Sequence, residues 1–255
     1  MFKFLRNPSP NGYVIDQFSL GVSLFPKTGS TSFKHFLFEA EHGQAFNKGK
    51  HGQAFKKGNK HIHNWARKNR IASLKDCKYR LILIRDPIER FISCYNNKVL
   101  QARLLDNRDI GPLSLSDPKR EFPYPSFEEF VDNFPEIRKL PVINHHTKPI
   151  SEFLGARNLN FYSEVFTFDQ IDNLAERINQ ITHANVAVSH HQNSANNDWD
   201  EAPTRVDLSS LTPPQFNYLT KLYSAEYRFL KPYYTKEGIR EKWQKKKDEL
   251  GYVHV

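Results

Sequence analysis

The stretch that most constrains the fold is residues 20–32, where an apolar strand runs through a tight turn into a helix start. Its sequence is LGVSLFPKTGSTS, and a further apolar run begins at Phe33. The first N–H groups of a helix lack intrahelical acceptors and attract anions. Gly29 lets the backbone approach a ligand closely, and Lys27 adds a positive charge. This stretch predicts an anion site, and the alternative is an ordinary strand–helix turn with a capping serine.

A second stretch repeats the order of strand, turn and helix. Residues 79–84 (YRLILI) form an apolar strand, and Arg85 follows directly. Asp86 and Pro87 are residues preferred at a helix N-cap and at the first helical position. Arginine at the carboxyl edge of a sheet suits a terminal phosphate, because its planar fork donates two hydrogen bonds. Ser93 lies two turns into this helix. The alternative is that Arg85 pairs with a carboxylate and Ser93 is a surface residue.

Strands alternate with helices along the chain, and this order is typical of α/β proteins. We therefore predict a three-layer, P-loop-like fold with a central parallel sheet flanked by helices. Strands are expected at residues 13–17, 20–25, 79–84 and 159–163. Helices are expected at 31–41, 62–74, 87–105, 126–134, 170–181, 213–230 and 236–249.

Length predicts a single domain. A chain of 255 residues can bury one substantial core, so one domain over 1–255 is expected, with its core at about 13–232. Residues 42–60 contain a nine-residue internal repeat rich in glycine and lysine, which predicts a basic loop. Residues 236–255 are a charged C-terminal tail, expected to form a solvated helix.

Composition limits the partners. The formal net charge of +9 indicates a polyanionic partner. The two cysteines, Cys77 and Cys94, are too few for a disulfide framework and fit a reducing compartment. No signal-peptide pattern or membrane-spanning run is evident in the sequence. A cytoplasmic location is therefore expected.

The two motif stretches together resemble a known pair. Residues 25–32 (FPKTGSTS) look like the 5′-phosphosulfate loop of sulfotransferases, and residues 85–93 (RDPIERFIS) look like their 3′-phosphate motif. The residue pattern of the two stretches is most similar to that of the carbohydrate sulfotransferases, which include the heparan 2-O- and chondroitin 4-O-enzymes and bacterial relatives. Residues 144–149, 191–194 and 211–230 resemble later elements of that family. The lack of a membrane anchor departs from the Golgi enzymes and indicates a bacterial or viral relative.

The resemblance implies a donor and the residues that hold it. The donor would be 3′-phosphoadenosine 5′-phosphosulfate (PAPS), and no metal would be required. Lys27 would also be catalytic, because a positioned cation stabilises the charge that develops on the leaving oxygen. The residues implied in donor binding are Lys27, Thr28, Gly29, Ser30, Thr31, Ser32, Arg85 and Ser93.

An acceptor hydroxyl also needs a base, and histidine is the usual choice near neutral pH. His61 and His63 resemble a His-x-His element of the heparan 2-O-branch, and His63 is the first candidate. Nearby lysine and arginine side chains favour the neutral imidazole. His145, His146 and Lys60 are the candidates for contacts with the acceptor, a carbohydrate or another hydroxyl compound.

Three alternatives remain open at this point. Histidine pairs at residues 61–63, 145–146 and 190–191 could form a zinc site, although no carboxylate or cysteine spacing supports one. The second alternative is a nucleotide kinase built on a similar sheet. In its Walker loop the lysine follows a glycine, whereas in this sequence the lysine precedes it. A non-catalytic polyanion-binding protein is a third. Nucleic acid is not an expected partner, and the sequence indicates no oligomeric state.

Overall fold

A computed structural model describes residues 10–47, 62–154, 159–188, 204–249 and 251. The chain divides into two compact units, which are described separately below. One unit contains residues 1–85 and 150–193, and the other contains residues 86–149 and 194–255. The single domain over 1–255 stays a prediction.

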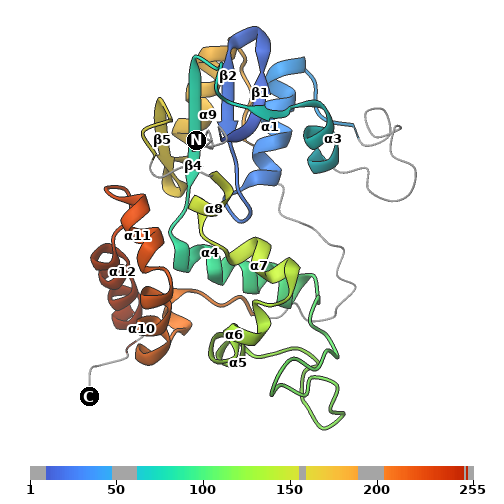
Figure 1. Cartoon of the computed structure of the whole chain (residues 1–255), viewed down its shortest axis with the longest axis vertical. Helices are drawn as coiled ribbons and strands as arrows, with labels where there is room; N and C mark the ends of the chain where they lie inside the picture. Colours follow the sequence, from blue (N-terminus) through green and yellow to red (C-terminus); the bar gives the residue numbers. More distant parts are fainter. Residues whose placement is uncertain (1–9, 48–61, 155–158, 189–203, 250, 252–255) are drawn as a thin grey trace, which may run out of the picture. The chain divides into compact units, whose positions relative to one another are not determined.

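The first unit contains a mixed five-stranded sheet (Figure 1). Its strands are β1 (Asn11–Ile15), β2 (Leu20–Ser23), β3 (Ile71–Ser73), β4 (Tyr79–Ile84) and β5 (Glu164–Thr167). Their order is β3-β1-β2-β4-β5. Strands β2, β4 and β5 are parallel, whereas β1 is antiparallel to both β2 and β3. The α/β class is confirmed. The predicted central parallel sheet is found in β2, β4 and β5, whereas the edge formed by β1 and β3 is antiparallel.

The register of the parallel strands brings their carboxyl ends to one edge. Ser23 of β2 lies opposite Ile82 of β4, and Ile84 of β4 lies opposite Thr167 of β5. Because parallel strands end at the same side of a sheet, the segments that follow them meet there. These segments are the glycine turn after β2, Arg85 after β4 and the short helical turn after β5.

Helices α1 (Ser30–His42), α3 (Ile62–Asn69) and α9 (Ile171–Thr182) share one core with the sheet. The strand residues in this core occupy alternate positions and so belong to one face of the sheet. Apolar burial on this face holds the glycine turn and the start of α1 against the strands. The fully buried members are Ile15, Leu20, Val22, Phe33, Leu37, Ala66, Leu81, Leu83, Leu174 and Ile178.

The opposite face is covered differently around β2. A Cβ atom added to Gly21 would lie 2.4 Å from Leu74 Cδ2 and 3.0 Å from Cys77 Sγ, so glycine leaves room for the side chains of Leu74 and Cys77 there. Ser23 shares a 2.9 Å hydrogen bond with Tyr162. Helices on both faces of the sheet are predicted, but at these positions turn residues cover the second face.

Two expected elements of the first unit differ from the structure. The helix expected at 62–74 ends at Asn69, and residues 71–73 form β3 instead. The strand expected at 159–163 is displaced, because β5 begins at Glu164. Pairing with a neighbouring strand decides both cases, and such pairing is not visible in local hydrophobic patterns. The short helix α8 (Ile150–Leu154) was not predicted.

In its described residues the second unit contains helices joined by turns and loops, and no named strand. Helix α4 (Pro87–Cys94) begins at an Asp86 N-cap whose side chain accepts from the N–H groups of Ile88 and Glu89, as predicted. A seven-residue π-helical segment, Tyr95–Gln101, continues α4.

Three further helices follow in the same unit. They are α5 (Phe127–Asp132), α6 (Phe134–Ile137) and α7 (Pro141–Thr147). A capping box forms at Ser126, with both of its hydrogen bonds present. The helix expected at 126–134 ends at Asp132, and a separate short helix, α6, begins at Phe134.

The C-terminal helices are α10 (Pro213–Leu222), α11 (Ser224–Leu230) and α12 (Lys236–Glu249). The single helix expected at 213–230 is thus two helices. Trp243 of α12 stacks on Phe216 with 4.5 Å between ring centroids. The predicted helix at 236–249 is confirmed, but its fully solvated character is wrong because Trp243 is buried.

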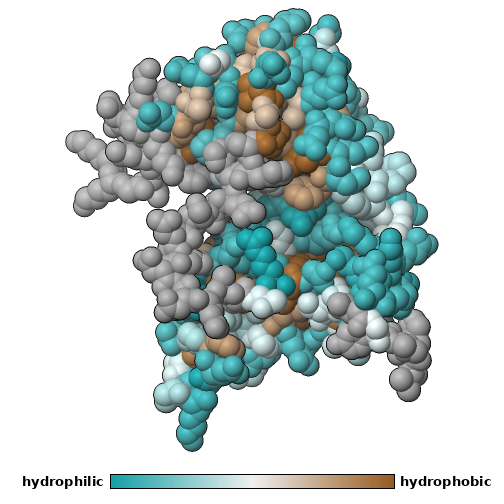
Figure 2. Space-filling view, turned by 180° about the vertical axis from the view of Figure 1, so that it is seen from behind, coloured by the Kyte–Doolittle hydropathy of each residue, from teal (hydrophilic) through white to brown (hydrophobic). Residues whose placement is uncertain are grey.

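Hydrophobic side chains on the face shown in Figure 2 form separate patches among hydrophilic ones. Among the described helices, none is both long enough and apolar enough to cross a membrane.

Candidate functional site

The turn after β2 has an unusual backbone. Lys27 and Gly29 both have positive φ angles, 68° and 71°, and flank Thr28. The buried Thr28 hydroxyl donates to the Phe25 carbonyl oxygen at 2.9 Å and accepts from the Phe25 N–H at 3.2 Å. These bonds fix the turn, and they also assign the Thr28 side chain a role inside it. The predicted contact between Thr28 and a ligand stays a prediction.

Gly29 is the N-cap residue of α1, and no side chain caps this helix end. The first helical hydrogen bond runs from the Phe33 N–H to the Gly29 carbonyl oxygen at 3.0 Å. The N–H groups of Ser30, Thr31 and Ser32 therefore have no acceptor within the helix. Because no acidic residue occupies the first turn, the positive end of the helix dipole is not neutralised by the helix itself. This helix start can accept an anion.

Arg85 joins the second motif to this turn. Its Nη1 atom donates to the Lys27 carbonyl oxygen at 3.0 Å. Its guanidinium also lies 4.3 Å from the ring centroid of Phe168, which follows β5. A Cβ atom on Gly29 would be 3.7 Å from the same Phe168 ring. Phe168 thus packs beside both the arginine and the glycine turn, a role that no local pattern in the sequence indicated.

Ser93 is half-buried on α4 and belongs to the second unit. Arg85 is the last residue of the first unit before the chain passes into the second. The joint action of Arg85 and Ser93 on one phosphate stays a prediction.

His63, the first candidate base, lies beside the helix start. Its Nε2 atom is 2.9 Å from Thr31 Oγ1, and its Nδ1 atom is 2.8 Å from Lys34 Nζ. The structure therefore brings the predicted base next to a predicted donor-binding residue. His61 and Lys60, the other candidates from this stretch, lie outside the described residues.

Lys34 was not predicted as a site residue. It follows Thr31 by three positions on α1, so both side chains lie on one face of the helix. Burial lowers the pKa of Lys34 to about 8. The i,i+3 spacing was the signal available in the sequence, but only the packing of α3 against α1 connects it to His63.

His145 and His146 lie near the end of α7 in the second unit, with 5.3 Å between ring centroids and 77° between ring planes. His145 is exposed and His146 is half-buried. Partial burial lowers the pKa of His145, and the charges of Lys148 and Lys98 lower it further. A neutral His145 has one N–H and one unprotonated nitrogen, so it can donate a hydrogen bond to a polar ligand or accept one from it.

Buried polar contacts hold the start of α4 within the second unit. Arg90 and Glu226 form a fully buried ion pair at 3.0 Å, and Arg90 also donates to the Lys148 carbonyl oxygen at 2.9 Å. The Tyr227 hydroxyl donates to the Asp86 carboxylate at 3.0 Å. Sequence analysis missed these partners, because they are 58 to 141 positions apart along the chain.

The zinc hypothesis finds no support in the described residues, where no three histidine, cysteine, aspartate or glutamate side chains are grouped so as to hold a metal ion. His61, His190 and His191, which that hypothesis also used, lie outside the described residues.

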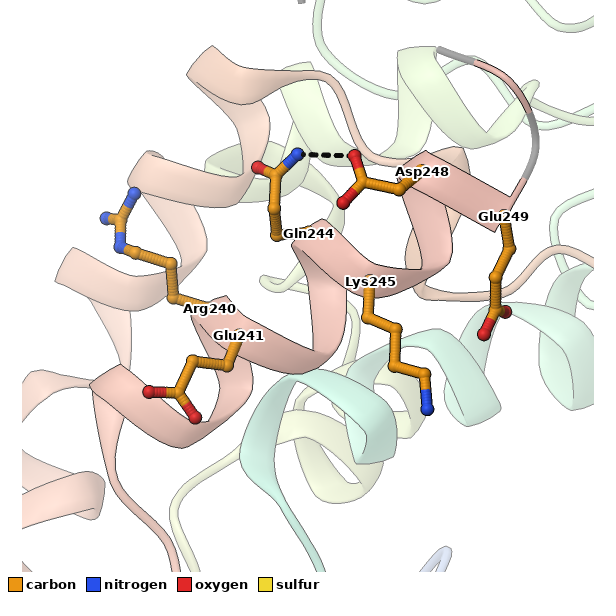
Figure 3. A pocket seen from close by; sticks show the side chains of 6 residues that line it. All are labelled: Arg240, Glu241, Gln244, Lys245, Asp248 and Glu249. Carbon is orange, nitrogen blue, oxygen red and sulfur yellow. Dashed lines mark hydrogen bonds between the residues drawn. The ribbon is translucent and has the colours of Figure 1, made fainter. Parts of the chain in front are cut away.

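A shallow depression lies on α12 (Figure 3). Charged and polar side chains line it, and a Gln244–Asp248 hydrogen bond of 3.0 Å crosses one end. None of the candidate site residues lines it. The lining residues are Arg240, Glu241, Gln244, Lys245, Asp248 and Glu249.

Comparison with known families identifies the class of protein. A family model described as the sulfotransferase family matches residues 14–234, which include both motif stretches. The chain therefore belongs to the sulfotransferase family, and it is a transferase whose family reaction is sulfuryl transfer. Comparisons with curated proteins and with solved structures gave no significant match.

Proposed function

We propose that this protein transfers the sulfuryl group of PAPS to a hydroxyl group, with a carbohydrate as the acceptor. One observation carries the proposal: the Arg85 guanidinium donates to the backbone of Lys27 and so joins the two motif stretches at one edge of the sheet. A donor with separate phosphate groups needs cationic and N–H contacts at two points. Arg85 and the start of α1 offer such contacts within one unit.

The residues of the first unit fit the charges of the donor. Its 5′-phosphosulfate would bind the N–H groups and hydroxyls of Ser30, Thr31 and Ser32, where the helix start favours negative charge. Arg85 would bind the 3′-phosphate, and Ser93 of the second unit is the other residue proposed to bind this phosphate. In this proposal the first unit is a P-loop-like donor-binding fold. Its lysine precedes the glycine, which differs from a Walker loop, and no metal ion is needed.

Lys27 and a histidine would catalyse the transfer. The transfer breaks the bond between sulfur and the bridging oxygen, and negative charge develops on that oxygen. The Lys27 ammonium would stabilise this charge. A histidine, His63 or His61, would take the proton that the attacking hydroxyl loses.

The acceptor proposal rests on charge. The net charge of +9 supports an acidic acceptor such as an anionic polysaccharide. His145, His146 and Lys60 are the proposed contacts to its hydroxyl and acidic groups. These assignments depend on side-chain chemistry alone.

A titration tests the donor assignment. Calorimetry without magnesium would compare adenosine 3′,5′-bisphosphate, the product nucleotide, with ATP and with single-stranded DNA. We expect the bisphosphate to bind, and Lys27→Ala and Arg85→Ala to lose this binding. Preference for ATP with a magnesium requirement would contradict the proposal. DNA binding that is sensitive to salt and indifferent to both variants would support a non-catalytic polyanion-binding protein instead.

Transfer of labelled sulfuryl from PAPS to a panel of polysaccharides would test the acceptor. Labelling of an acidic polysaccharide is expected. Labelling of small phenols alone, with no polysaccharide labelled, would contradict the carbohydrate assignment.

A further inference from the structure

Three side chains from α1 and α3 form a hydrogen-bonded row beside the helix start. Lys34 Nζ is 2.8 Å from His63 Nδ1, and His63 Nε2 is 2.9 Å from Thr31 Oγ1. Thr31 is in the first turn of α1, where the proposed donor would bind. Both ring nitrogens of His63 therefore have partners on α1.

The chemistry of lysine decides the direction of these bonds. An ammonium group has three donors and no acceptor, so Nδ1 of His63 must accept from Lys34. A neutral imidazole carries one N–H, which must then be on Nε2 and must donate to Thr31 Oγ1. Burial lowers the pKa of Lys34 to about 8, so the ammonium form still predominates at pH 7.

The direction of the bond at Thr31 has a consequence for the ligand. Since the Thr31 oxygen accepts from His63, its own hydrogen is directed at another acceptor. An oxygen of a bound anion at the start of α1 is such an acceptor. With the opposite tautomer, Nε2 would accept the Thr31 hydrogen and the ligand would lose this donor.

We propose that Lys34 is a positioning residue that holds His63 in the Nε2–H tautomer and thereby presents the Thr31 hydroxyl as a hydrogen-bond donor to the bound sulfuryl donor. The part concerning the ligand rests on the proposed function. In this arrangement Nε2 already carries a proton and Nδ1 accepts from Lys34. His63 can therefore take a proton from the attacking hydroxyl only after its contact with Lys34 changes.

The tautomer can be read directly from the full-length protein. Long-range ¹H–¹⁵N spectra of histidine-labelled protein at pH 7 distinguish a protonated from an unprotonated ring nitrogen. We expect protonated Nε2 and unprotonated Nδ1 for His63. Lys34→Met should lose this preference, and Lys34→Arg, which keeps a cationic donor, should retain it. Lys75→Met is the matched control, because it removes one exposed positive charge from the same unit.

Two spectral outcomes would overturn the proposal. One is a wild-type His63 that is protonated on Nδ1. The other is an unchanged His63 signal in Lys34→Met when circular dichroism shows a wild-type fold. Lys34→Leu replaces Lys34→Met if the methionine variant does not fold.

Nucleotide binding tests the second half of the proposal. The affinity for adenosine 3′,5′-bisphosphate should fall about tenfold in Lys34→Met and in Thr31→Val, as expected for loss of a hydrogen bond to a charged group. Lys34→Met should have little further effect in the Thr31→Val background, because Lys34 acts through Thr31. An equally large further loss there would show that Lys34 acts directly and would overturn the proposal. Absence of any bisphosphate binding to wild type would contradict the proposed function, whereas the spectra would still test the tautomer.

Discussion

The guanidinium of Arg85 donates a 3.0 Å hydrogen bond to the backbone carbonyl of Lys27, although the two residues are 58 positions apart in the chain. Arg85 directly follows the carboxyl end of β4, and Lys27 lies in the turn beyond the carboxyl end of β2, the adjacent parallel strand. The contact fixes the backbone of Lys27, a residue with a positive φ angle in the turn before α1. Arg85 therefore acts on the shape of the turn as well as on the charge of the site.

Replacement of Arg85 by lysine tests this double role. Lysine keeps the charge but loses the planar fork and the stacking on Phe168. We expect Arg85→Lys to weaken binding of adenosine 3′,5′-bisphosphate about tenfold or more, as measured by calorimetry.

Arg80, on strand β4, provides a matched control for the Arg85 variant. Arg80 Nε donates to the Phe161 carbonyl oxygen at 2.7 Å, and its guanidinium lies 5.0 Å from the Phe161 ring centroid. Arg80→Lys therefore disrupts an equivalent contact at the other end of β4. We expect it to leave nucleotide affinity near the wild-type value. Equal losses in the two variants would mean that the effect reflects sheet stability instead of the site.

Lys27→Ala should lower the rate of sulfuryl transfer by about two to three orders of magnitude, since a positioned charge on the leaving oxygen is lost. Single-turnover transfer from labelled PAPS to an accepted polysaccharide would measure it. Lys75→Ala removes a lysine from the same unit and should keep the wild-type rate. A Lys27→Ala enzyme with an unchanged single-turnover rate would exclude Lys27 from this role.

The Asp86 carboxyl predicts a pH effect on stability. Burial raises its pKa to about 7, the nearby Glu89 charge adds to this, and hydrogen bonds from the Glu89 N–H, the Tyr227 hydroxyl and the Ile88 N–H oppose it. The folded state therefore binds this proton more tightly than the unfolded state, whose carboxyl has an ordinary pKa near 4. The associated stability is complete below about pH 4 and is lost as the pH rises to about 7.

Asp86→Asn should remove this dependence and keep an acceptor for the helix cap. The free energy of unfolding of Asp86→Asn relative to wild type should increase between pH 4 and pH 7, by at most about 4 kcal/mol. Urea unfolding followed by circular dichroism at several pH values would measure the difference. A difference that stays constant across this range would show that Asp86 does not titrate there.

The buried ion pair of Arg90 and Glu226 gives a prediction about stability. Arg90→Met leaves the Glu226 carboxylate buried without its countercharge, and it should lower the free energy of unfolding by about 3–5 kcal/mol. Adding Glu226→Gln should recover part of this loss, because the amide needs no countercharge. Urea unfolding at pH 7 would measure both variants.

An exposed ion pair in the same unit supplies the control. Lys139 and Glu136 are paired at 2.7 Å on the surface, and Lys139→Met should change the unfolding free energy by less than about 1 kcal/mol. If the double variant at Arg90 and Glu226 is no more stable than Arg90→Met, an uncompensated charge is not the cause of the loss.

Local sequence patterns predicted the elements that depend on neighbouring residues. The turn with Gly29 and the Asp86 N-cap both form, because each needs only side chains and N–H groups a few residues apart. The apolar run at residues 79–84 likewise predicted strand β4, whose residues Leu81 to Ile84 are fully buried.

Elements that depend on distant partners could not be predicted in this way. The antiparallel β1 and the short β3 take their direction from hydrogen bonds to each other and to β2, and the break at Tyr223 divides one apolar pattern into two helices. Phe168 and Lys34 entered the candidate site only through packing of α3 and the segment after β5.

The sequence by itself determined the two motif stretches, their chemistry and the sulfotransferase family to which they belong. Only the tertiary structure decided that Arg85 holds the Lys27 backbone and that Lys34 and Thr31 share the two nitrogens of His63. The physical reason is the separation along the chain of the groups that interact. Caps, turns and strand propensities arise between neighbours in the chain, whereas a hydrogen bond between distant segments exists only after the sheet register and helix packing have brought them together.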